Sequence, residues 1–189
     1  AEQKFNPDYY GGEPIWQTVS KQGKTSAVLF WPGSDVPDYP DYWTLYDDSV
    51  PLEKRLGTVI NWVDGNDENG VEMPKHADLM MTYWEDPDAI GHGYGPDASE
   101  VGEVMKFIDG ELGKFFDELY SRDALNCINL IIMTDHGMAG VEGEEAQTLD
   151  TFLPNIDLDN EVFTRSGVPA SIGKSLSQPD AWEHLKPEI

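Results

Sequence analysis

The sequence predicts an α/β fold in which a mainly parallel sheet is sandwiched between helices. The first observation is that apolar runs of strand length, at 26–31, 79–84 and 128–134, alternate with amphipathic stretches of helical period. The second is the spacing between these runs, because parallel strands need crossover connections of a dozen or more residues, usually helical. Strand, helix, strand, helix, strand therefore follow one another along the chain.

The composition supports a buried core and limits the partners. Of 189 residues, 39% are hydrophobic and 11% aromatic, which excludes a chain that is disordered throughout. The 36 acidic and 12 basic residues give a formal net charge of −24, and a field of that sign repels nucleic-acid duplexes and anionic membranes. No apolar run approaches the roughly 20 residues of a membrane-spanning helix. We expect no sequence-specific nucleic-acid partner, and membrane contact only through an anchor outside these residues.

The first helix and strand are bounded by clear signals. Residues 14–22 predict a short helix with Ile15 and Val19 on its apolar face, and Gly23 is its stop signal. The run at 26–31 is uninterrupted by polar side chains after its first residue, which is typical of a strand buried on both faces. A Pro-Gly pair ends it.

A polar, aromatic-rich loop is expected over 33–48, followed by a helix. Ser49 can cap this helix, which runs to residue 63. Its apolar positions recur at helical spacing and predict one buried face. They are Leu52, Leu56, Val59, Ile60 and Val63.

The longest helix follows the second strand. Asp97 and Glu100 resemble a capping pair at its start. Its predicted buried face holds Val101, Val104, Met105, Ile108, Leu112, Phe115, Phe116 and Leu119. The third strand, 128–134, comes next. Beyond residue 140 the pattern weakens, and we predict only a helix near 146–153.

Two carboxylate–histidine pairs stand directly after predicted strands. Asp88 and His92 are four residues apart, so one turn of backbone can aim both at one point. Asp135 and His136 are adjacent and must diverge, which suits two neighbouring metal ions better than one. Mixed imidazole and carboxylate ligands favour zinc. Either pair alone also fits an ordinary surface turn, but both at the ligand-binding edge of one parallel sheet favour chemistry.

Two other features have a structural reading. The segment 64–70 resembles the start of a calcium-binding loop in composition. However, its glycine is at the seventh position instead of the sixth, and Lys75 stands where the bidentate acid is required. We therefore predict an exposed turn. The single cysteine, Cys127, is expected to be a buried thiol beside a strand. The alternative is a half-cystine whose partner lies outside these residues.

Several motifs in register resemble one family. The segments EDPDAIGHGYGP (85–96) and TDHGM (134–138) resemble the ectonucleotide pyrophosphatase/phosphodiesterase family of the alkaline-phosphatase-like superfamily, and FWPGSD (30–35) and GEPIW (12–16) are similar to its upstream segments. The likeness runs in order over about residues 5 to 140. It implies an alkaline-phosphatase-like fold that is incomplete here, with 1–189 as a single partial catalytic domain truncated at both ends.

The resemblance also implies a metal centre. Asp88 and His92 look like ligands of one zinc ion, and Asp135 and His136 look like ligands of a second, so that two Zn²⁺ are expected. Family members complete the sites with an upstream Asp, a Thr that is also the nucleophile, and a downstream His. None of these matches a position in this chain, so we expect no catalytic nucleophile within it and no turnover by these residues alone.

A substrate pocket is implied in the same way. Trp31, Tyr46 and Tyr83 stand where the family lines its pocket with aromatic rings, and Asp35 stands where a polar contact to a nucleobase edge is expected. For Trp31 and Tyr83, core packing at a strand end is the alternative.

The function implied is zinc-dependent hydrolysis of phosphodiester or pyrophosphate bonds in small-molecule nucleotides, with release of nucleoside 5′-monophosphates. An extracellular or cell-surface location is implied with it. Two alternatives remain: a phospholipid or choline-ester phosphodiesterase of the same family, and a non-catalytic fragment that lacks the nucleophile.

Overall fold

The computed structural model describes residues 5–7 and 10–140, together with the backbone of two short strands. The chain divides into two compact units, Ala1–Gly140 and Val141–Ile189. In the second unit, β4 (Val162–Arg165) pairs antiparallel with β5 (Ser171–Lys174). The helix predicted near 146–153 lies outside the described residues. All of the predicted site residues are in the first unit.

Three parallel strands form the sheet of the first unit, in the order β2-β1-β3. They are β1 (Ser26–Leu29), β2 (Tyr42–Thr44) and β3 (Leu79–Thr82). β1 and β3 confirm the first two predicted strands. β2 lies inside the segment predicted as a loop, and that part of the prediction was wrong, because three residues are too few for a strand period to be visible in the sequence.

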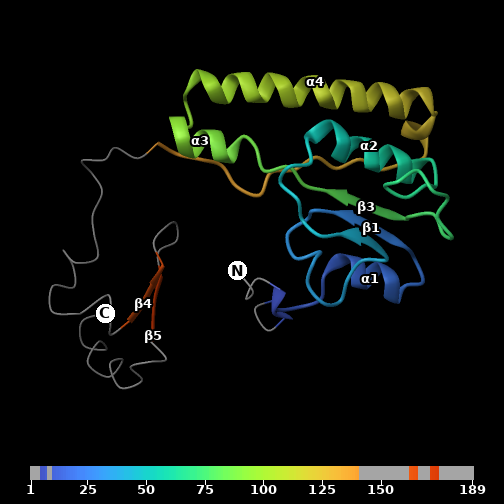
Figure 1. The fold of residues 1–189 in the computed structure, drawn as a ribbon, viewed down its shortest axis with the longest axis horizontal. Helices are drawn as coiled ribbons and strands as arrows, with labels where there is room; N and C mark the ends of the chain where they lie inside the picture. Colours follow the sequence, from blue (N-terminus) through green and yellow to red (C-terminus); the bar gives the residue numbers. More distant parts are fainter. Residues whose placement is uncertain (1–4, 8–9, 141–161, 166–170, 175–189) are drawn as a thin grey trace. The chain divides into compact units, whose positions relative to one another are not determined.

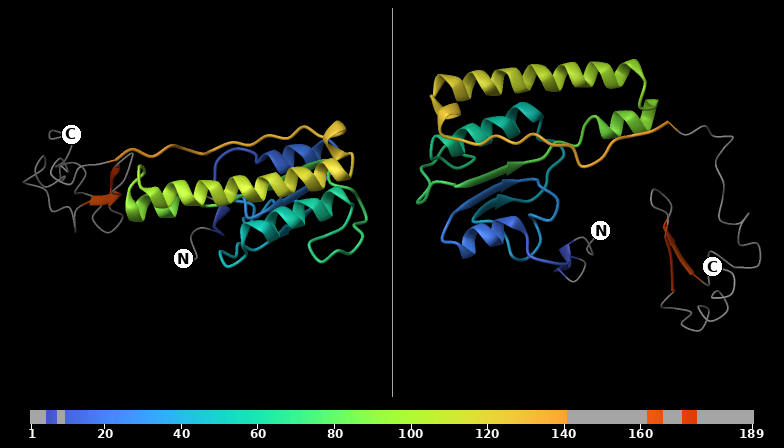
Figure 2. Two further views of the ribbon diagram at one scale, coloured as in Figure 1. Left: turned by 90° about the horizontal axis from the view of Figure 1, so that it is seen from above. Right: turned by 180° about the vertical axis from the view of Figure 1, so that it is seen from behind.

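Helices cover both faces of this sheet. Figures 1 and 2 show α1 (Ile15–Lys21) on one side of the strands and α2 (Leu52–Val63) on the other, with α4 (Ser99–Ser121) lying along α2 farther from the sheet. The sandwich of helices around a parallel sheet is thereby confirmed. A shorter helix, α3 (Asp88–Tyr94), connects β3 to α4.

Two apolar clusters hold these layers together. The first joins the sheet to α2 and the second joins α2 to α4. The members of the first are Ala27, Leu29, Phe30, Trp62 and Met73, and those of the second are Leu52, Leu56, Ile60, Phe115 and Leu119. Because α2 contributes to both clusters, its position decides where the ends of the strands lie relative to α4.

The predicted helix faces were partly wrong. In α1 the buried side chain is Trp16, whereas Ile15 is 54% exposed, because the Trp16 indole donates a hydrogen bond to the Asp38 carbonyl at 2.8 Å and turns that face inward. In α4 the buried side chains are Phe115 and Leu119, whereas Met105 and Phe116 are exposed. Contact with α2 alone covers only a narrow stripe of α4, so the wider predicted face is not all buried.

The predicted helix caps were also wrong. The N-cap of α2 is Pro51, and the Ser49 hydroxyl instead donates to the Asp47 carboxylate at 2.6 Å. The N-cap of α4 is Ala98, and the carboxylate of Glu100 accepts from the Ser99 hydroxyl at 3.1 Å. In both places a nearby side-chain contact competes with the capping geometry.

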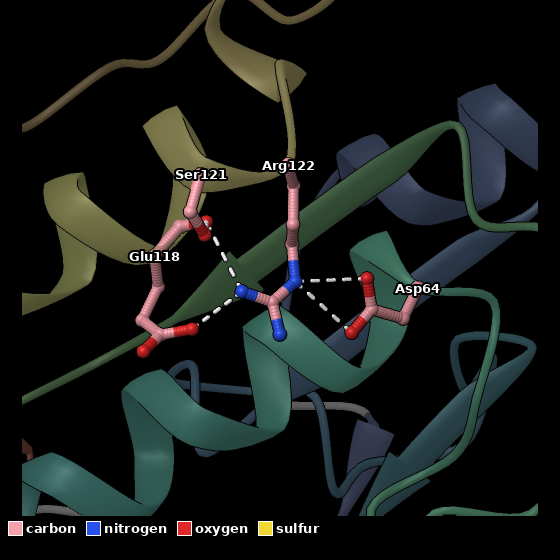
Figure 3. Close-up of polar contacts among 4 residues, drawn as sticks. All are labelled: Asp64, Glu118, Ser121 and Arg122. Carbon is pink, nitrogen blue, oxygen red and sulfur yellow. Dashed lines mark hydrogen bonds and ion pairs between the residues drawn. The ribbon is translucent and has the colours of Figure 1, made fainter.

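An ion-pair cluster joins the ends of α2 and α4. Nε of Arg122 lies 2.9 Å from Oδ1 and 3.0 Å from Oδ2 of Asp64, which is the C-cap of α2 (Figure 3). The same guanidinium donates to the Glu118 carboxylate and to the Glu118 carbonyl one turn back in α4. This link lies at the opposite end of α2 from the strand-end edge of the sheet.

The predicted third strand, 128–134, is not a strand in the structure, and this prediction was wrong. The segment follows α4 without joining a described ladder. Its apolar side chains Leu130, Ile131, Ile132 and Met133 are 42%, 80%, 62% and 66% exposed. Such a run pairs as a buried strand only when both of its faces are covered, and the described residues do not cover it. Cys127, just before it, is a free and exposed thiol, so the expected burial was wrong for the same reason.

Asp41 ties the beginning of β1 to the beginning of β2 and predicts a pH dependence of stability. Partial burial raises the pKa of Asp41, but hydrogen bonds from the Ser26 backbone N–H (2.9 Å), the Ser26 hydroxyl (3.0 Å) and the Ser20 hydroxyl (3.0 Å) outweigh it and lower the pKa. A carboxyl with a lowered folded-state pKa stabilises the fold above its unfolded pKa of about 3.9, and this contribution is lost as the pH falls through the folded value.

Asp41→Asn should therefore lose stability at neutral pH and differ progressively less from the wild type as the pH falls below about 4. Chemical denaturation of both chains over a pH series measures this difference. Asp48→Asn, which changes an exposed carboxylate on the other side of β2, is the matched control. A difference between wild type and Asp41→Asn that stays constant down to about pH 3 would contradict the role of the carboxylate.

Candidate active site at the carboxyl ends of the strands

The predicted site residues follow the carboxyl ends of the strands. Trp31 and Asp35 follow β1, Tyr46 follows β2, and Tyr83 follows β3. Because parallel strands end at the same edge of the sheet, these segments meet there.

Asp88 and His92 lie on α3, a helix that the sequence analysis missed. Asp88 is its first residue, and one turn later Nε2 of His92 lies 3.5 Å from Oδ1 of Asp88. The glycines at 91, 93 and 95 hid the helix, since glycine disfavours helices. Gly91 has a packing reason, because a Cβ there would lie 2.6 Å from the sulfur of Met138.

The segment that follows 128–134 brings Asp135 and His136 close to Asp88. Nε2 of His136 lies 3.8 Å from Oδ1 of Asp88 and 3.8 Å from Oδ2 of Asp135. The structure thus places Asp88 between the two imidazoles, and all four predicted ligands form one cluster. Their assignment as metal ligands stays a prediction.

The cluster has one atom whose environment suits a cation. Oδ1 of Asp88 is buried, and it has no hydrogen-bond partner in the described structure. A buried carboxylate oxygen without a donor is costly unless a positive charge faces it. Within the ranges that the structure describes, no group of three or more His, Cys, Asp or Glu side chains could hold a metal ion. The donor types are those of a zinc site, but the described residues by themselves do not form a complete set of ligands.

The local charges raise the pKa values of several groups around the cluster. Burial, together with the charges of Glu85 and Asp88, raises the pKa of Asp86. A hydrogen bond to the Gly137 carbonyl, together with the charges of Asp135 and Asp88, raises the pKa of His136. Each shift favours the protonated form, and the nearby carboxylates contribute to both shifts as the smaller cause.

The four predicted substrate residues line one pocket. Trp31, Asp35, Tyr46 and Tyr83 all contribute to a pocket of about 260 Å³. The structure adds residues that the sequence analysis did not identify, among them Tyr10, Phe30 and Ser34. The ring of Phe30 packs edge-on against that of Tyr46, with centroids 5.4 Å apart. The substrate roles of the four residues remain predictions.

Tyr83 belongs to this pocket and is influenced by charges of the carboxylate–histidine cluster. It lines the pocket, and burial, followed by the charges of Asp135, Glu85 and Asp88, raises the pKa of its phenol. The phenol of Tyr46 also has a raised pKa, from burial and then from the charge of Glu85. Both tyrosines therefore stay neutral at physiological pH and can serve as stacking and hydrogen-bonding groups.

A second pocket, of about 270 Å³, lies elsewhere on the first unit. Its lining includes the carboxylates of Asp41, Asp67, Glu68 and Glu72. Such a lining repels anionic substrates. The segment 64–70 beside it forms a turn in which the Asp67 carboxylate accepts the backbone N–H groups of Asn69 and Val71, at 2.8 and 2.9 Å. The predicted turn is confirmed, but it is only partly exposed, since Gly65 is buried and Asn66 and Asp67 are half-buried.

Arg55 and Glu85 are the important residues that the sequence analysis missed. Arg55 is 0% exposed and pairs with Glu85, with NH1 2.8 Å from Oε2. No signal in the sequence singles out Arg55, because Glu53, Lys54 and Arg55 all stand between Leu52 and Leu56 and Arg55 falls beside the predicted apolar face. A charged side chain is rarely fully buried unless it is paired.

The fold and the strand-end cluster define an alkaline-phosphatase-like protein, and the comparisons with known proteins agree. The family model for type I phosphodiesterase / nucleotide pyrophosphatase matches residues 1–186. The chain belongs to this family, which confirms the resemblance seen in the sequence. Within the described ranges, no helix combines the length and the apolar character that crossing a membrane requires.

Individual relatives show how much of a longer protein the chain represents. It is 41% identical over 208 residues to human ectonucleotide pyrophosphatase/phosphodiesterase family member 1, covering 100% of this chain and 22% of the relative. It is 36% identical over 155 residues to the venom phosphodiesterase CdcPDE of Crotalus durissus collilineatus, covering 80% and 18%. The chain thus spans about a fifth of the length of these relatives.

Solved structures match over most of the chain. Murine ectonucleotide pyrophosphatase/phosphodiesterase 5 superimposes with a TM-score of 0.76 at 29% identity, covering 94% of this chain and 44% of that one. An inactive variant of the same murine protein, with a threonine replaced by alanine and in complex with AMP, superimposes with a TM-score of 0.73 at 30% identity, covering 92% and 44%.

Proposed function

We propose that this chain is part of the catalytic domain of an enzyme that hydrolyses phosphodiester or pyrophosphate bonds in nucleotides, with the help of two zinc ions, and releases nucleoside 5′-monophosphates. The observation that carries the proposal is that Tyr83 lines the aromatic pocket and stands in the segment that leads from β3 to Asp88 of the carboxylate–histidine cluster. A ligand with a planar ring and a phosphate matches that arrangement. The murine structure with AMP supports it.

The candidate site residues of this chain would have two roles, metal binding and substrate binding. Asp88, His92, Asp135 and His136 would hold the metal. Bound zinc supplies Lewis-acid chemistry, lowering the pKa of a hydroxyl or water and neutralising charge on the phosphoryl oxygens.

The pocket residues would hold the base. Trp31, Tyr46 and Tyr83 would stack on it, and Asp35 would accept a hydrogen bond from its edge. The inactive threonine-to-alanine variant of the murine protein supports the expectation of a threonine nucleophile, which we place outside these residues.

The exposed apolar segment supports the proposal of a partial domain over 1–189. Leu130 to Met133 have the sequence of a buried strand but are exposed, and such a run is normally covered by more protein. We also propose an extracellular or cell-surface location, which the venom enzyme and the human ectonucleotide pyrophosphatase/phosphodiesterase among the relatives support. Any membrane anchor would lie outside this chain, and no nucleic-acid duplex is expected as a partner.

The test measures kcat/KM of the full-length enzyme, of which we propose that this chain is a part, for three chromogenic esters. The nitrophenyl ester of thymidine 5′-monophosphate should be hydrolysed with a higher kcat/KM than bis(nitrophenyl) phosphate or nitrophenyl phosphorylcholine. The 189-residue chain alone should show no turnover. Preference for the phosphorylcholine ester would instead favour the phospholipid or choline-ester alternative. Robust hydrolysis by the chain alone would contradict the assignment of an outside nucleophile.

Removing a stacking ring should weaken nucleotide binding in particular. Stacking of a base on an aromatic side chain contributes about 1–3 kcal/mol, so Trp31→Ala should raise KM for the nucleotide ester about 5- to 150-fold. Trp43→Ala is the matched control, because Trp43 stacks on Tyr39, with centroids 4.2 Å apart, and does not line the pocket. Equal KM values in Trp31→Ala and wild type would contradict a stacking role for Trp31.

A further inference from the structure

Arg55 makes hydrogen bonds to two segments at the strand-end edge, the entrance to α2 and the segment that follows β3. Nε donates to the Val50 carbonyl at 2.7 Å, at the entrance to α2. NH1 donates to the Tyr83 carbonyl at 3.0 Å and to Oε2 of Glu85 at 2.8 Å, and NH2 donates to Oε1 of Glu85 at 3.2 Å. A completely buried guanidinium is thus bound to the segment that leads from β3 to Asp88.

The same guanidinium packs against aromatic rings that follow all three strands. Its central carbon lies 4.9 Å from the ring centroid of Phe30, 4.5 Å from that of Trp84 and 5.8 Å from that of Tyr46. Phe30 has a φ of +62°, a left-handed conformation that is unfavourable for a bulky residue and that persists only where the surroundings enforce it. The stack on Arg55 is part of those surroundings.

These contacts connect the two halves of the candidate active site. Phe30, Tyr46 and Tyr83 line the aromatic pocket, while Glu85 stands three residues before Asp88 in the carboxylate–histidine cluster. Arg55 contacts the pocket rings of Phe30 and Tyr46 directly, and it is linked to the cluster only through Glu85.

We propose that Arg55 is a positioning residue that holds the aromatic pocket and the 85–88 segment in one fixed relation, so that a base seated in the pocket carries its phosphate to the carboxylate–histidine cluster. Only a planar, fixed-charge group can make the two-point contact with Glu85 and stack between rings in this way. Lysine has a compact ammonium with neither property. The inference deepens the proposed function and takes its substrate from it, whereas the geometry stands independently.

If Arg55 holds the pocket and the 85–88 segment together, its replacement should lower kcat/KM most for a substrate that carries a base. In the full-length enzyme, Arg55→Lys should lower kcat/KM for the nitrophenyl ester of thymidine 5′-monophosphate by about 100-fold, the size of effect that a misplacement of about 1 Å produces. Bis(nitrophenyl) phosphate has no base to align, so its kcat/KM should fall much less. A ratio of the two kcat/KM values that is unchanged from wild type would overturn the proposal.

Two further variants separate positioning from a general loss of folding. Arg122→Lys makes the same chemical change in the ion pair between Arg122 and Asp64, at the C-terminal end of α2, and it should leave the substrate ratio unchanged. Glu85→Gln keeps the shape and a carbonyl acceptor for Arg55 while removing the charge, and it should lower the ratio by a smaller factor than Arg55→Lys. If Arg55→Lys does not fold, the ratio in Glu85→Gln decides, and a ratio equal to wild type overturns the proposal.

Fluorine NMR of the 189-residue chain tests the geometry without any activity. With fluorotryptophan at the six tryptophans, Glu85→Gln and Arg55→Lys should shift the signals of Trp84, which touches Arg55, and of Trp31 in the pocket, while those of Trp16 and Trp43 stay in place. A shift of Trp84 alone would overturn the coupling to the pocket. If the full-length wild type hydrolyses neither ester, the proposed function fails, and this measurement still decides the role of Arg55.

Discussion

His92→Ala and Asp135→Asn are each expected to abolish zinc retention and hydrolysis in the full-length enzyme. His92 and Asp135 lie on opposite sides of the cluster centred on Asp88 and His136, so each variant removes one predicted donor. Loss of an outer partner of a metal ligand already costs about 10- to 100-fold in metal affinity, and loss of a ligand itself should exceed this. Elemental analysis after dialysis and the rate with the nucleotide nitrophenyl ester measure both effects.

The controls use the same chemical changes away from the cluster. His76→Ala removes an exposed histidine that packs beside Gly65, and Asp109→Asn changes an exposed position on α4. Both should keep the zinc content and the rate of the wild type. Near-normal zinc in both His92→Ala and Asp135→Asn would count against this cluster as the metal site, whatever the activity.

Glu85→Ala is expected to lower the free energy of unfolding of the chain by about 3–5 kcal/mol. The guanidinium of Arg55 is fully buried and the Glu85 side chain is 28% exposed. Removing the carboxylate leaves a buried charge with only carbonyl and ring partners, and this uncompensated charge is the source of the cost. Urea denaturation followed by tryptophan fluorescence measures the change.

A matched substitution in an exposed pair shows whether burial is the cause. Glu118→Ala removes a partner of Arg122 from a surface cluster, and such pairs contribute about 0–1 kcal/mol. The double variant Arg55→Met, Glu85→Ala should recover part of the stability lost in Glu85→Ala, because no unpaired charge remains in the core. A loss in Glu85→Ala no larger than that in Glu118→Ala would contradict the buried-charge explanation.

The elements that the sequence predicted correctly are those with a strong local pattern. After Ser26, β1 is an uninterrupted apolar run, and all four residues of the strand are buried. The five apolar positions predicted on α2 all face the two clusters, because a period of 3.6 residues is set by the helix itself. Asp88 and His92 could be found because they follow β3 at the edge where parallel strands end, a rule that depends on fold class and not on detailed packing. Asp135 and His136 were found from their motif, since the segment before them is not a strand in the structure.

The elements that were missed depend on contacts distant in the sequence. β2 forms because β1 offers it a neighbour, and α3 forms despite its glycines where Met138 packs against Gly91. The segment 128–134 has the pattern of a buried strand but is unpaired in the described structure. The sequence pattern could not predict this, because it does not show whether the residues that would cover the strand are present. Cys127 is exposed for that reason too.

The sequence alone was sufficient for the α/β class, the family and the eight candidate site residues, since period, strand-end position and motif are properties of neighbouring positions. Only the folded chain showed that Asp88 lies between both histidines, that the four substrate candidates share one pocket, and that Arg55 joins the pocket rings to Glu85, in the segment that leads to Asp88. Those relations join residues up to about 50 positions apart, and they are set by how α2 packs on the sheet. Packing of that kind depends on the shapes of many side chains at once, which a linear pattern does not contain.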